Sequence, residues 1–200
     1  MNNLLDKKFN DPFITADGNK RAFIEAKKIN TLWFNTGTLC NIECKNCYIE
    51  SSPKNDRLVY LTFDEVKLFI DEAIDNNLKT KEIGFTGGEP FMNKDILKMV
   101  DYALEKKFKV LILSNAMKPM LNKKDELLKL RHPNLTIRVS IDHYKKTKHE
   151  EIRGKGTYEV MMKGLNWLSQ NNFNFALATR LIWDESENNL RQNFQEFINT

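Results

Sequence analysis

The sequence has 200 residues, of which 41% are hydrophobic and 29% are charged. This length suits one ordinary domain with a sizeable core, and the composition excludes a disordered or collagen-like chain. No run of eighteen apolar residues is present, so a membrane partner is not expected, and the first ten residues lack the apolar stretch of a secretory signal. The net charge of +4 is spread along the chain and does not by itself indicate a nucleic-acid partner.

Hydrophobic periodicity predicts strands that alternate with helices. The expected strands are Thr31–Asn35, Glu82–Thr86, Phe108–Leu113, Leu135–Ile141 and Phe173–Thr179. The expected helices are Thr62–Asn76, a segment from Asn93 to about Leu104, Asn122–Leu130, Tyr158–Ser169 and a last one around Leu190–Phe197. Thr62 followed by Glu65 supplies a capping box for the first of these helices.

The connections between successive strands are too long for hairpins, which predicts parallel strands with helices packed outside. The strand Phe108–Leu113 ends in an unbroken apolar run that suits burial on both faces of a parallel sheet. We therefore expect residues 31–200 to form one α/β domain of about five β–α units. Residues 1–30 are expected to be a lead-in segment, in which Arg21–Ala26 forms an extra strand or hairpin.

Polar or glycine-containing peptides directly follow the predicted strands. They are Gly37–Cys47, Thr86–Pro90, Ser114–Asn115, Ser140–His143 and Thr179–Arg180. In barrels and open α/β sheets the loops at the carboxyl ends of the strands converge, and active sites form there. Solvation explains a single polar turn but not three cysteines together with a Gly-Gly-Glu, so we expect an active site at this edge of the sheet.

All three cysteines lie in the pattern Cys40-x3-Cys44-x2-Cys47. An odd, clustered set is not a disulfide framework, and it indicates a metal site in a reducing compartment. Sulfur ligands at this spacing select zinc, Cu(I) or an iron–sulfur cluster. Structural zinc sites and ordinary [4Fe–4S] clusters take four protein ligands, yet no fourth cysteine or suitably spaced histidine is present. Three thiolates therefore suggest a cluster with one iron open to a bound molecule.

The segment CNIECKNCY resembles the cysteine signature of the radical S-adenosylmethionine (SAM) superfamily. Three later segments resemble further motifs of that superfamily, namely TGGEP at Thr86–Pro90, LSN at Leu113–Asn115 and RVSID at Arg138–Asp142. The stretch HEEIRGKGTYEVMMKGLNWL is similar to the segment that follows in the molybdenum-cofactor and peptide-modifying branches. The resemblance runs from about Thr31 to the end of the chain, and it implies a partial (β/α)6-type barrel of parallel strands with outer helices.

The sequence departs from the superfamily pattern in two respects. Asn46 precedes the last cysteine, where the superfamily usually has an aromatic or apolar residue, and Tyr48 lies just beyond that cysteine. This weakens any expectation of adenine packing at this position but does not affect the cluster ligands. The superfamily core usually has six β–α units, and only five are present here, which is expected of a fragment or an abbreviated member.

The resemblance implies that Cys40, Cys44 and Cys47 each bind one iron of a [4Fe–4S] cluster, while the amino and carboxylate groups of SAM bind the fourth. An electron from the reduced cluster would then cleave SAM into methionine and a 5′-deoxyadenosyl radical, which abstracts hydrogen from an unidentified substrate. The expected protein is therefore a radical SAM enzyme whose reaction class is unresolved.

Residues at other strand ends are expected to hold SAM. The resemblance implies that Gly87 and Gly88 bind the methionyl amino group with the Glu89 carboxylate nearby, and the alternative is a simple strand-to-helix turn started by Pro90. The side chains expected to hydrogen-bond the ribose or the methionyl carboxylate are Ser140, Asp142 and Asn115, with loop capping as the alternative.

Further candidates follow from position alone. Arg153 and Arg180 are candidates to pair with the SAM carboxylate, although a solvated surface position is an equal expectation for Arg153. His143 and Tyr144 lie just past the fourth predicted strand and are candidates to face the substrate, with simple exposure as the alternative for the histidine. Met161 and Met162, at helical spacing, are expected to pack in the core.

Two other classes of function stay open at this point. One is a non-catalytic iron–sulfur or zinc-binding protein, and the other is an RNA-modifying enzyme, although no basic stripe interleaved with aromatic residues is present. The similarity to particular branches favours a peptide or a small molecule as substrate. We expect a cytoplasmic protein whose partners are SAM, that substrate and an electron donor such as a flavodoxin or ferredoxin.

Overall fold

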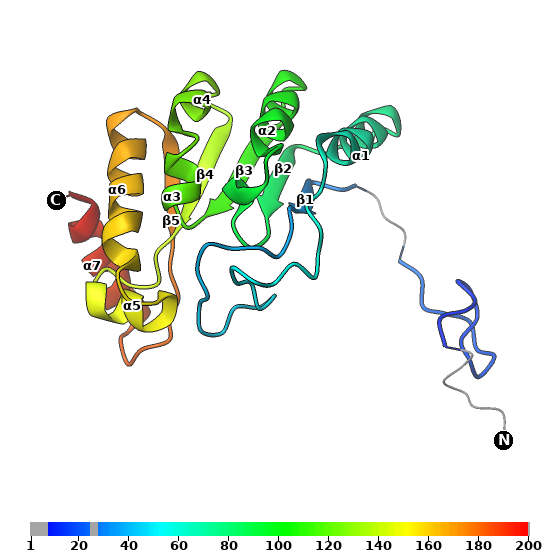
Figure 1. Cartoon of the computed structure of the whole chain (residues 1–200). Helices are drawn as coiled ribbons and strands as arrows, with labels where there is room; N and C mark the ends of the chain where they lie inside the picture. The colour runs from blue at the N-terminus through cyan, green and yellow to red at the C-terminus, as the bar shows by residue number, and fades with distance from the viewer. Residues whose placement is uncertain (1–7, 25–27, 200) are drawn as a thin grey trace.

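The structure is a computed structural model in which residues 8–24 and 28–199 are described (Figure 1). Its centre is a parallel sheet in the order β1-β2-β3-β4-β5, so that each strand lies beside the next one in the sequence. The strands are β1 (Thr31–Asn35), β2 (Glu82–Thr86), β3 (Lys109–Ser114), β4 (Leu135–Ser140) and β5 (Asn174–Ala178). Each corresponds to a predicted strand, and the predicted α/β fold is confirmed.

Helices follow the strands in turn. They are α1 (Phe63–Asp75), the short 3-10 helix η2 (Pro90–Met92), α2 (Ile96–Glu105), α3 (Lys118–Leu121), α4 (Lys124–Lys129), α5 (Lys146–Arg153), α6 (Thr157–Gln170) and α7 (Glu187–Asn199). The predicted capping box is confirmed, because the Glu65 carboxylate accepts a hydrogen bond from Thr62 N at 2.7 Å and the Thr62 hydroxyl accepts one from Glu65 N. The periodicity does not predict α5, because only His149 and Ile152 are buried in this polar helix.

The described part of the lead-in segment lacks the predicted strand. Residues 21–24 have no regular secondary structure, whereas Glu25 and Ala26 lie outside the described residues. An antiparallel bridge joins Ile14 to Lys20 instead, so a short hairpin-like turn precedes the position at which the strand was expected. The strand expected over Arg21–Ala26 is therefore absent from its described part, whereas the hairpin-like turn reaches Arg21, whose N donates to Phe13 O at 2.8 Å.

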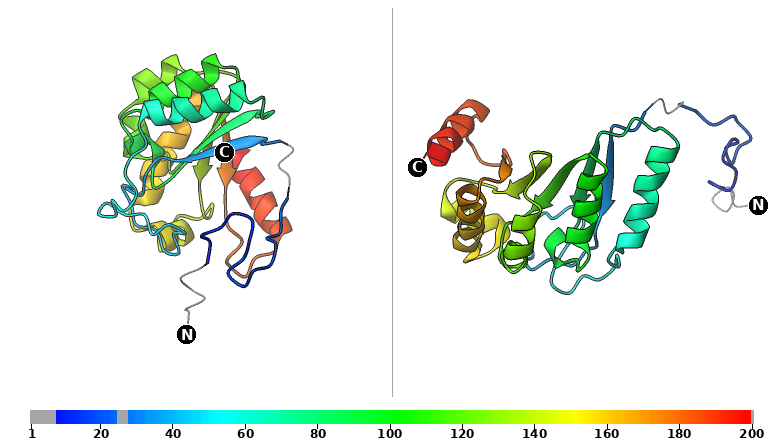
Figure 2. Two further views of the ribbon diagram at one scale, coloured as in Figure 1. Left: turned by 90° about the vertical axis from the view of Figure 1, so that its right-hand side faces the viewer. Right: turned by 90° about the horizontal axis from the view of Figure 1, so that it is seen from above.

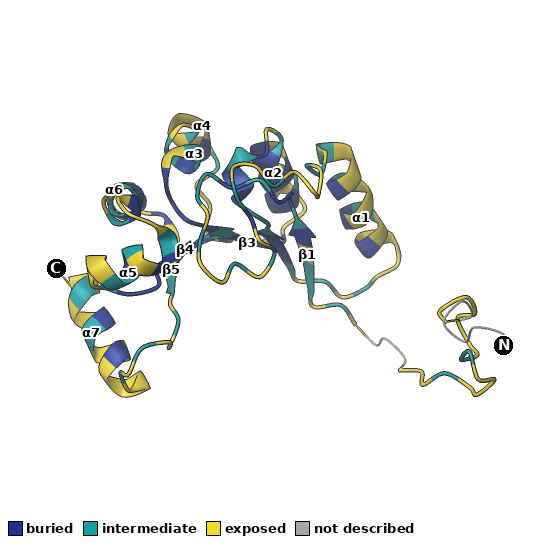
Figure 3. Cartoon of the chain, turned by 60° about the horizontal axis from the view of Figure 1, so that its bottom comes forward, coloured by how far each residue is buried: buried dark blue, intermediate teal, exposed yellow. Residues whose placement is uncertain are grey.

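The hydrophobic core lies between the sheet and the helices that cover one of its faces (Figure 2). Helices α1 and α2 carry their buried residues on one side and exposed residues on the other (Figure 3). Along β3, Val110 and Ile112 are buried in this core, whereas Leu111 and Leu113 on the other face are only half-buried. The prediction that this strand is buried on both faces is wrong, because five strands leave the inner face of the curved sheet open. No helix in the described ranges is long and apolar enough to cross a bilayer.

Replacing Gly164 by alanine is expected to destabilise the fold where α6 packs against the loop after β3. A Cβ atom at Gly164 would lie 1.8 Å from the carbonyl oxygen of Ala116, and a backbone oxygen cannot rotate away. Overpacking of this kind costs about 1–3 kcal/mol or more, which outweighs the roughly 1 kcal/mol gained when alanine replaces glycine in a helix. We expect a lower free energy of unfolding in urea titrations.

Gly84→Ala is the matched control for this prediction. The three atoms nearest its Cβ would all belong to the ring of Trp33, and a side chain that is 47% exposed can shift more easily than a backbone oxygen. We expect it to destabilise the protein less than Gly164→Ala, and equal losses of stability would contradict the steric argument.

Candidate active site

A cavity of about 420 Å³ lies at the carboxyl ends of the strands. The loop after β1, which carries the cysteines, crosses below these ends in Figure 1. The residues singled out from the sequence that line the cavity are Cys40, Cys44, Cys47, Gly87, Gly88, Asn115, Ser140, Asp142, Arg153 and Arg180. The fold thus brings together residues from all five strand ends and from α5. Among the other candidates, Glu89, His143 and Tyr144 are not lining residues.

The cysteine loop and the glycine pair meet through their backbones. Beyond the ends of β1 and β2, Gly88 N donates to Gly37 O at 2.8 Å and Glu89 N donates to Leu39 O at 3.1 Å. A Cβ atom at Gly88 would lie 2.1 Å from Leu39 O, so a residue with a side chain does not fit at this position. The glycines therefore permit the close approach that places Cys40 beside the β2 loop.

The three thiols share an environment that suits a soft metal centre. None forms a disulfide, and Cys40 is buried while Cys44 and Cys47 are half-buried. Burial raises the pKa of the Cys40 thiol to about 12 and also raises the pKa of Cys44. Without a metal these two are neutral thiols, and a metal that binds them displaces their protons. Three free thiols facing one cavity fit the donor set of an iron–sulfur cluster.

Two hydrogen bonds support the sulfur atoms. Ser51 N donates to Cys47 Sγ at 3.3 Å, and Asn115 Nδ2 lies 3.8 Å from Cys40 Sγ. Asn115 Nδ2 also donates to Asn41 Oδ1 at 2.9 Å. Such contacts orient metal ligands and tune cluster potentials, so Asn115 acts on the cysteine loop in addition to lining the cavity. Within the described ranges, no three histidine, cysteine or acidic side chains already surround a point suited to a single ion.

Glu89 lies behind the cavity wall and ties β2 to β3. Its carboxylate is 1% exposed and accepts hydrogen bonds from the Ser114 hydroxyl at 2.9 Å, Asn115 N at 2.8 Å and Phe91 N at 3.2 Å. Burial raises the pKa of this carboxyl to about 7, and the three donors oppose the rise. Glu89 therefore holds the glycine turn and the Ser114–Asn115 turn in register.

Glu89→Gln is expected to change the pH dependence of stability. The folded protein holds a proton on Glu89 up to about pH 7, whereas the unfolded chain loses it near 4.5. The folded state therefore binds more protons between these values, and this group lowers stability as the pH rises from 5 to 8, by up to about 3 kcal/mol. In urea titrations the stability advantage of the wild type over Glu89→Gln should shrink by a comparable amount between these two pH values.

Glu65→Gln is the control for this titration. In the wild type the exposed Glu65 carboxylate caps α1, and its pKa is lowered because Thr62 donates to it. This carboxylate therefore stays ionised across the same pH range. The stability difference for this variant should not change between pH 5 and 8. A difference for Glu89→Gln that is likewise independent of pH would contradict the argument.

Asp142 holds both candidate arginines. Arg153 Nε lies 2.6 Å from Asp142 Oδ2, and Arg180 Nε lies 2.7 Å from Oδ1. The Asp142 side chain is 1% exposed and that of Arg153 is 11% exposed, so Arg153 is not a solvated surface residue. The sequence did not show that these three residues form one ion network. The ion network fixes the guanidinium groups of Arg153 and Arg180 in the cavity wall, where an anion can reach them.

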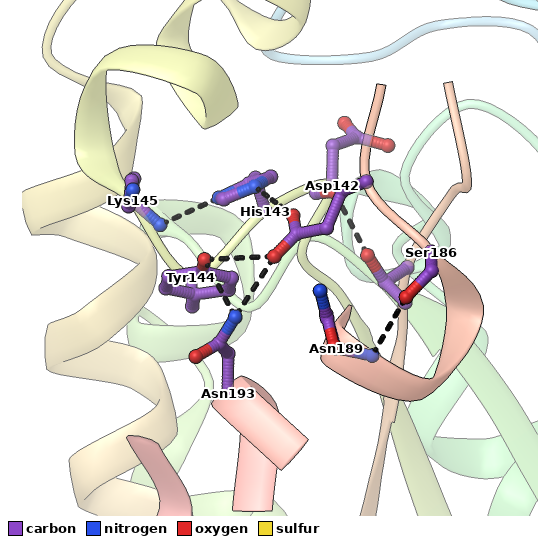
Figure 4. Close-up of polar contacts among 9 residues, drawn as sticks. Asp142, His143, Tyr144, Lys145, Ser186, Asn189 and Asn193 are labelled. Atoms are coloured by element: carbon purple, nitrogen blue, oxygen red, sulfur yellow. Dashed lines mark hydrogen bonds and ion pairs between the residues drawn. The ribbon is translucent and has the colours of Figure 1, made fainter. Parts of the chain in front are cut away.

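His143 and Tyr144 belong to a second network rather than to the cavity lining (Figure 4). Glu185 accepts hydrogen bonds from Tyr144 Oη at 3.0 Å and Asn193 Nδ2 at 2.8 Å, and its Oε2 lies 3.1 Å from His143 Nε2. Lys145 N donates to His143 Nδ1, which assigns the ring proton to Nε2. Burial lowers the pKa of His143, and the ring is fully buried. Glu185, which the sequence gave no reason to select, joins the β4 loop to α7.

The two methionines behave as predicted from their helical spacing. Met161 is 1% exposed, and Met162 is partly buried against the same core.

Comparison with known proteins identifies the family. Residues 34–191 match the family model of the Radical SAM superfamily, so the chain belongs to this superfamily of enzymes. Radical SAM enzymes use a [4Fe–4S] cluster together with SAM, and the cavity described above holds the three thiols and the glycine turn that the superfamily pattern requires.

The individual relatives are longer than this chain. The antilisterial bacteriocin subtilosin biosynthesis protein AlbA of Bacillus subtilis (strain 168) is 33% identical over 132 residues, which are 65% of this chain and 28% of AlbA. Fe-coproporphyrin III synthase of Methanosarcina barkeri is 30% identical over 149 residues, 72% of this chain and 35% of the synthase. Among solved structures, Streptococcus suis SuiB bound to precursor peptide SuiA has a TM-score of 0.59 at 17% identity, covering 86% of this chain and 47% of SuiB. The chain thus spans about a third of these curated relatives, and the structural likeness shows the partial-barrel fold.

Proposed function

We propose that Cys40, Cys44 and Cys47 bind a [4Fe–4S] cluster and that residues 31–200 form a radical SAM core domain preceded by a lead-in segment. The observation that carries the proposal is that all three thiols line one cavity with Gly87 and Gly88. When bound, the cluster supplies the electron that cleaves SAM into methionine and a 5′-deoxyadenosyl radical. The three free thiols also favour a reducing compartment such as the cytoplasm.

The remaining lining residues are proposed to hold SAM. Gly87 and Gly88 line the cavity and carry no side chain that would keep a ligand from their backbone. Backbone carbonyl oxygens are acceptors of the kind that an ammonium group needs, because that group can only donate. Asp142 keeps Arg153 and Arg180 at the wall, where their guanidinium groups favour the methionyl carboxylate.

Two further groups complete this proposal. Ser140 and Asn115 line the same cavity and offer hydrogen-bonding groups to the ribose. Glu89 acts on the ligand indirectly, since its carboxylate is occupied by donors from the chain itself.

We propose a peptide or a small molecule as the substrate from which the radical abstracts hydrogen. The bacteriocin biosynthesis protein among the relatives supports a peptide, and the porphyrin synthase supports a small molecule. A flavodoxin or a ferredoxin is the proposed source of the electron.

Anaerobic reconstitution with iron and sulfide tests the proposal. We expect a brown protein with about four irons per chain, an EPR signal of the reduced cluster that changes when SAM is added, and release of 5′-deoxyadenosine after dithionite is supplied. A fully loaded cluster whose signal ignores SAM and which releases no 5′-deoxyadenosine would instead identify a non-catalytic iron–sulfur protein.

A further inference from the structure

A second cleft, of about 710 Å³, adjoins the cysteine loop from the outside. Its lining includes Asn41 and Ile42, which lie between the first two cysteines, and residues of α3, α4 and the start of α6. In Figure 1 α3 lies beside α6, and residue contacts between the two helices agree with this view. Ile42 lines both this cleft and the cavity with the thiols, so the two adjoin at this residue.

A short covalent and hydrogen-bonded route joins the cleft to the sulfur ligands. Asn41 is bonded directly to Cys40 in the chain, and its Oδ1 accepts a hydrogen bond from Asn115 Nδ2 at 2.9 Å. The same Nδ2 lies 3.8 Å from Cys40 Sγ. The lining of this cleft therefore adjoins the cysteine loop that carries the proposed cluster ligands.

The cleft is positively charged. Lys118, Lys123 and Lys155 line it, from the start of α3, the α3–α4 junction and the turn before α6, and Glu126 is the one acidic residue in the lining. None of the three lysines forms an ion pair with another residue in the described part of the chain. The amino end of α6, which begins beside the lysine of that turn, adds the positive end of a helix dipole. An acidic surface complements this arrangement.

The redox chemistry of the proposed function requires a carrier to dock near the thiols. The 200 residues contain no second set of cysteines, so an electron that reaches this site enters across their surface. Electron transfer slows steeply with distance, which favours a docking site separated from the cluster by one layer of residues. We infer that the cleft lined by Lys118, Lys123 and Lys155 is the docking surface for an acidic one-electron carrier protein. This inference rests on the proposed function and adds to it the place at which the electron enters.

The transfer balances as a single-electron step. The hydroquinone of a reduced flavodoxin loses one electron to become the semiquinone, and the oxidised cluster gains that electron, with no bond made or broken in this chain. The lysines attract and orient the carrier, so their contribution is to the association rate and to its salt dependence.

A charge-reversal variant, Lys118→Glu, Lys123→Glu and Lys155→Glu together, tests the surface. The matched control reverses Lys81, Lys109 and Lys129, which are exposed and lie at the opposite, amino-end edge of the sheet. Growth of the reduced-cluster EPR signal is followed after mixing reconstituted protein with reduced flavodoxin, without SAM. We expect the second-order rate of the cleft variant to fall about tenfold or more and to lose its decrease with rising salt, whereas the control changes less than about threefold.

Carbodiimide cross-linking of the unaltered, loaded protein to flavodoxin provides a readout that needs no substitution. Cross-links from flavodoxin carboxylates to Lys118, Lys123 or Lys155 are expected, and cross-links confined to other lysines would overturn the inference. Equal rates for the two variants would overturn it as well. If the cleft variant instead kept its flavodoxin rate and lost salt-sensitive binding of transfer RNA, the cleft would be a nucleic-acid surface and the inference wrong.

The proposed function is tested separately, with dithionite in place of flavodoxin. Release of 5′-deoxyadenosine under dithionite by both variants, together with a slow flavodoxin reaction of the cleft variant alone, supports both proposals. Absence of 5′-deoxyadenosine from the unaltered protein would remove the catalytic proposal, while the flavodoxin rates and cross-links would still decide where the carrier docks.

Discussion

Replacing any one of Cys40, Cys44 and Cys47 by serine is expected to abolish the cluster and, with it, release of 5′-deoxyadenosine. All three thiols line the same cavity, and the chain has no other cysteine to replace one that is lost. Substituting a residue that only supports a metal ligand commonly lowers metal affinity 10–100-fold. Removing a ligand itself should exceed that, so we expect product release to fall by more than about a hundredfold, with loss of the brown colour and of the EPR signal.

Ser51→Ala is the control for the cysteine variants. Ser51 lines the same cavity as the thiols, and its buried hydroxyl has no hydrogen-bond partner. Its contact to Cys47 Sγ comes from the backbone N–H. This variant keeps that contact and should load iron and sulfide normally. A serine variant that retained four irons, or an unaltered protein that held a colourless ion, would show that the thiols do not ligate an iron–sulfur cluster.

The strands and the gathering of polar loops at one edge were predictable because they depend on local patterns. The apolar runs of β1 to β5 and the capping box of α1 involve residues close together in the chain. Parallel connection then places every strand end on the same side, which is why the cysteine loop and the glycine turn meet.

Other parts of the site depend on contacts between distant residues and left little trace in the sequence. Asp142 pairs with Arg153 eleven positions later and with Arg180 in another loop, so neither pairing follows from periodicity. Glu185 contacts His143 across 42 positions, and that contact helps to bury a histidine for which exposure was the alternative expectation. For the network of Asp142 and the two arginines, the available sequence signal was the occurrence of Asp and Arg at strand ends. No sequence signal indicated the contact of Glu185 with His143.

Glu89 also shows the difference between what a local motif predicts and what contacts between distant residues decide. Its place in a Gly-Gly-Glu after β2 was readable, and resemblance implied a carboxylate near the amino group of SAM. The folded chain surrounds that carboxylate with Ser114, Asn115 and Phe91, so its observed contacts connect two loops. Whether a motif residue contacts the ligand or its neighbours depends on side-chain packing, which a motif does not encode.

Gly88→Ala is expected to separate the β2 loop from the cysteine loop. The added Cβ would lie 2.1 Å from Leu39 O and 2.8 Å from Thr38 O, and both are backbone atoms held by the pairing of the two loops. Relief requires the loops to move apart, which breaks the hydrogen bonds from Gly88 N to Gly37 O and from Glu89 N to Leu39 O. We expect a loss of about 1–3 kcal/mol in stability and at least a tenfold loss of iron loading, measured by urea titration and by iron and sulfide content.

Gly154→Ala separates this steric effect from the general strain of replacing a glycine. Gly154 has a φ of 99° and a ψ of 155°, a backbone conformation that essentially only glycine adopts, but nothing lies within 4 Å of its added Cβ. The substitution therefore costs only the backbone strain, of about 1–3 kcal/mol. It should therefore destabilise the chain to a similar degree while leaving iron loading unchanged. If both variants loaded iron alike, the tight packing of Gly88 on the Leu39 backbone would not be what aligns the thiols, and the position of the cysteine loop would depend instead on contacts such as those of Asn115 with Asn41 and Cys40.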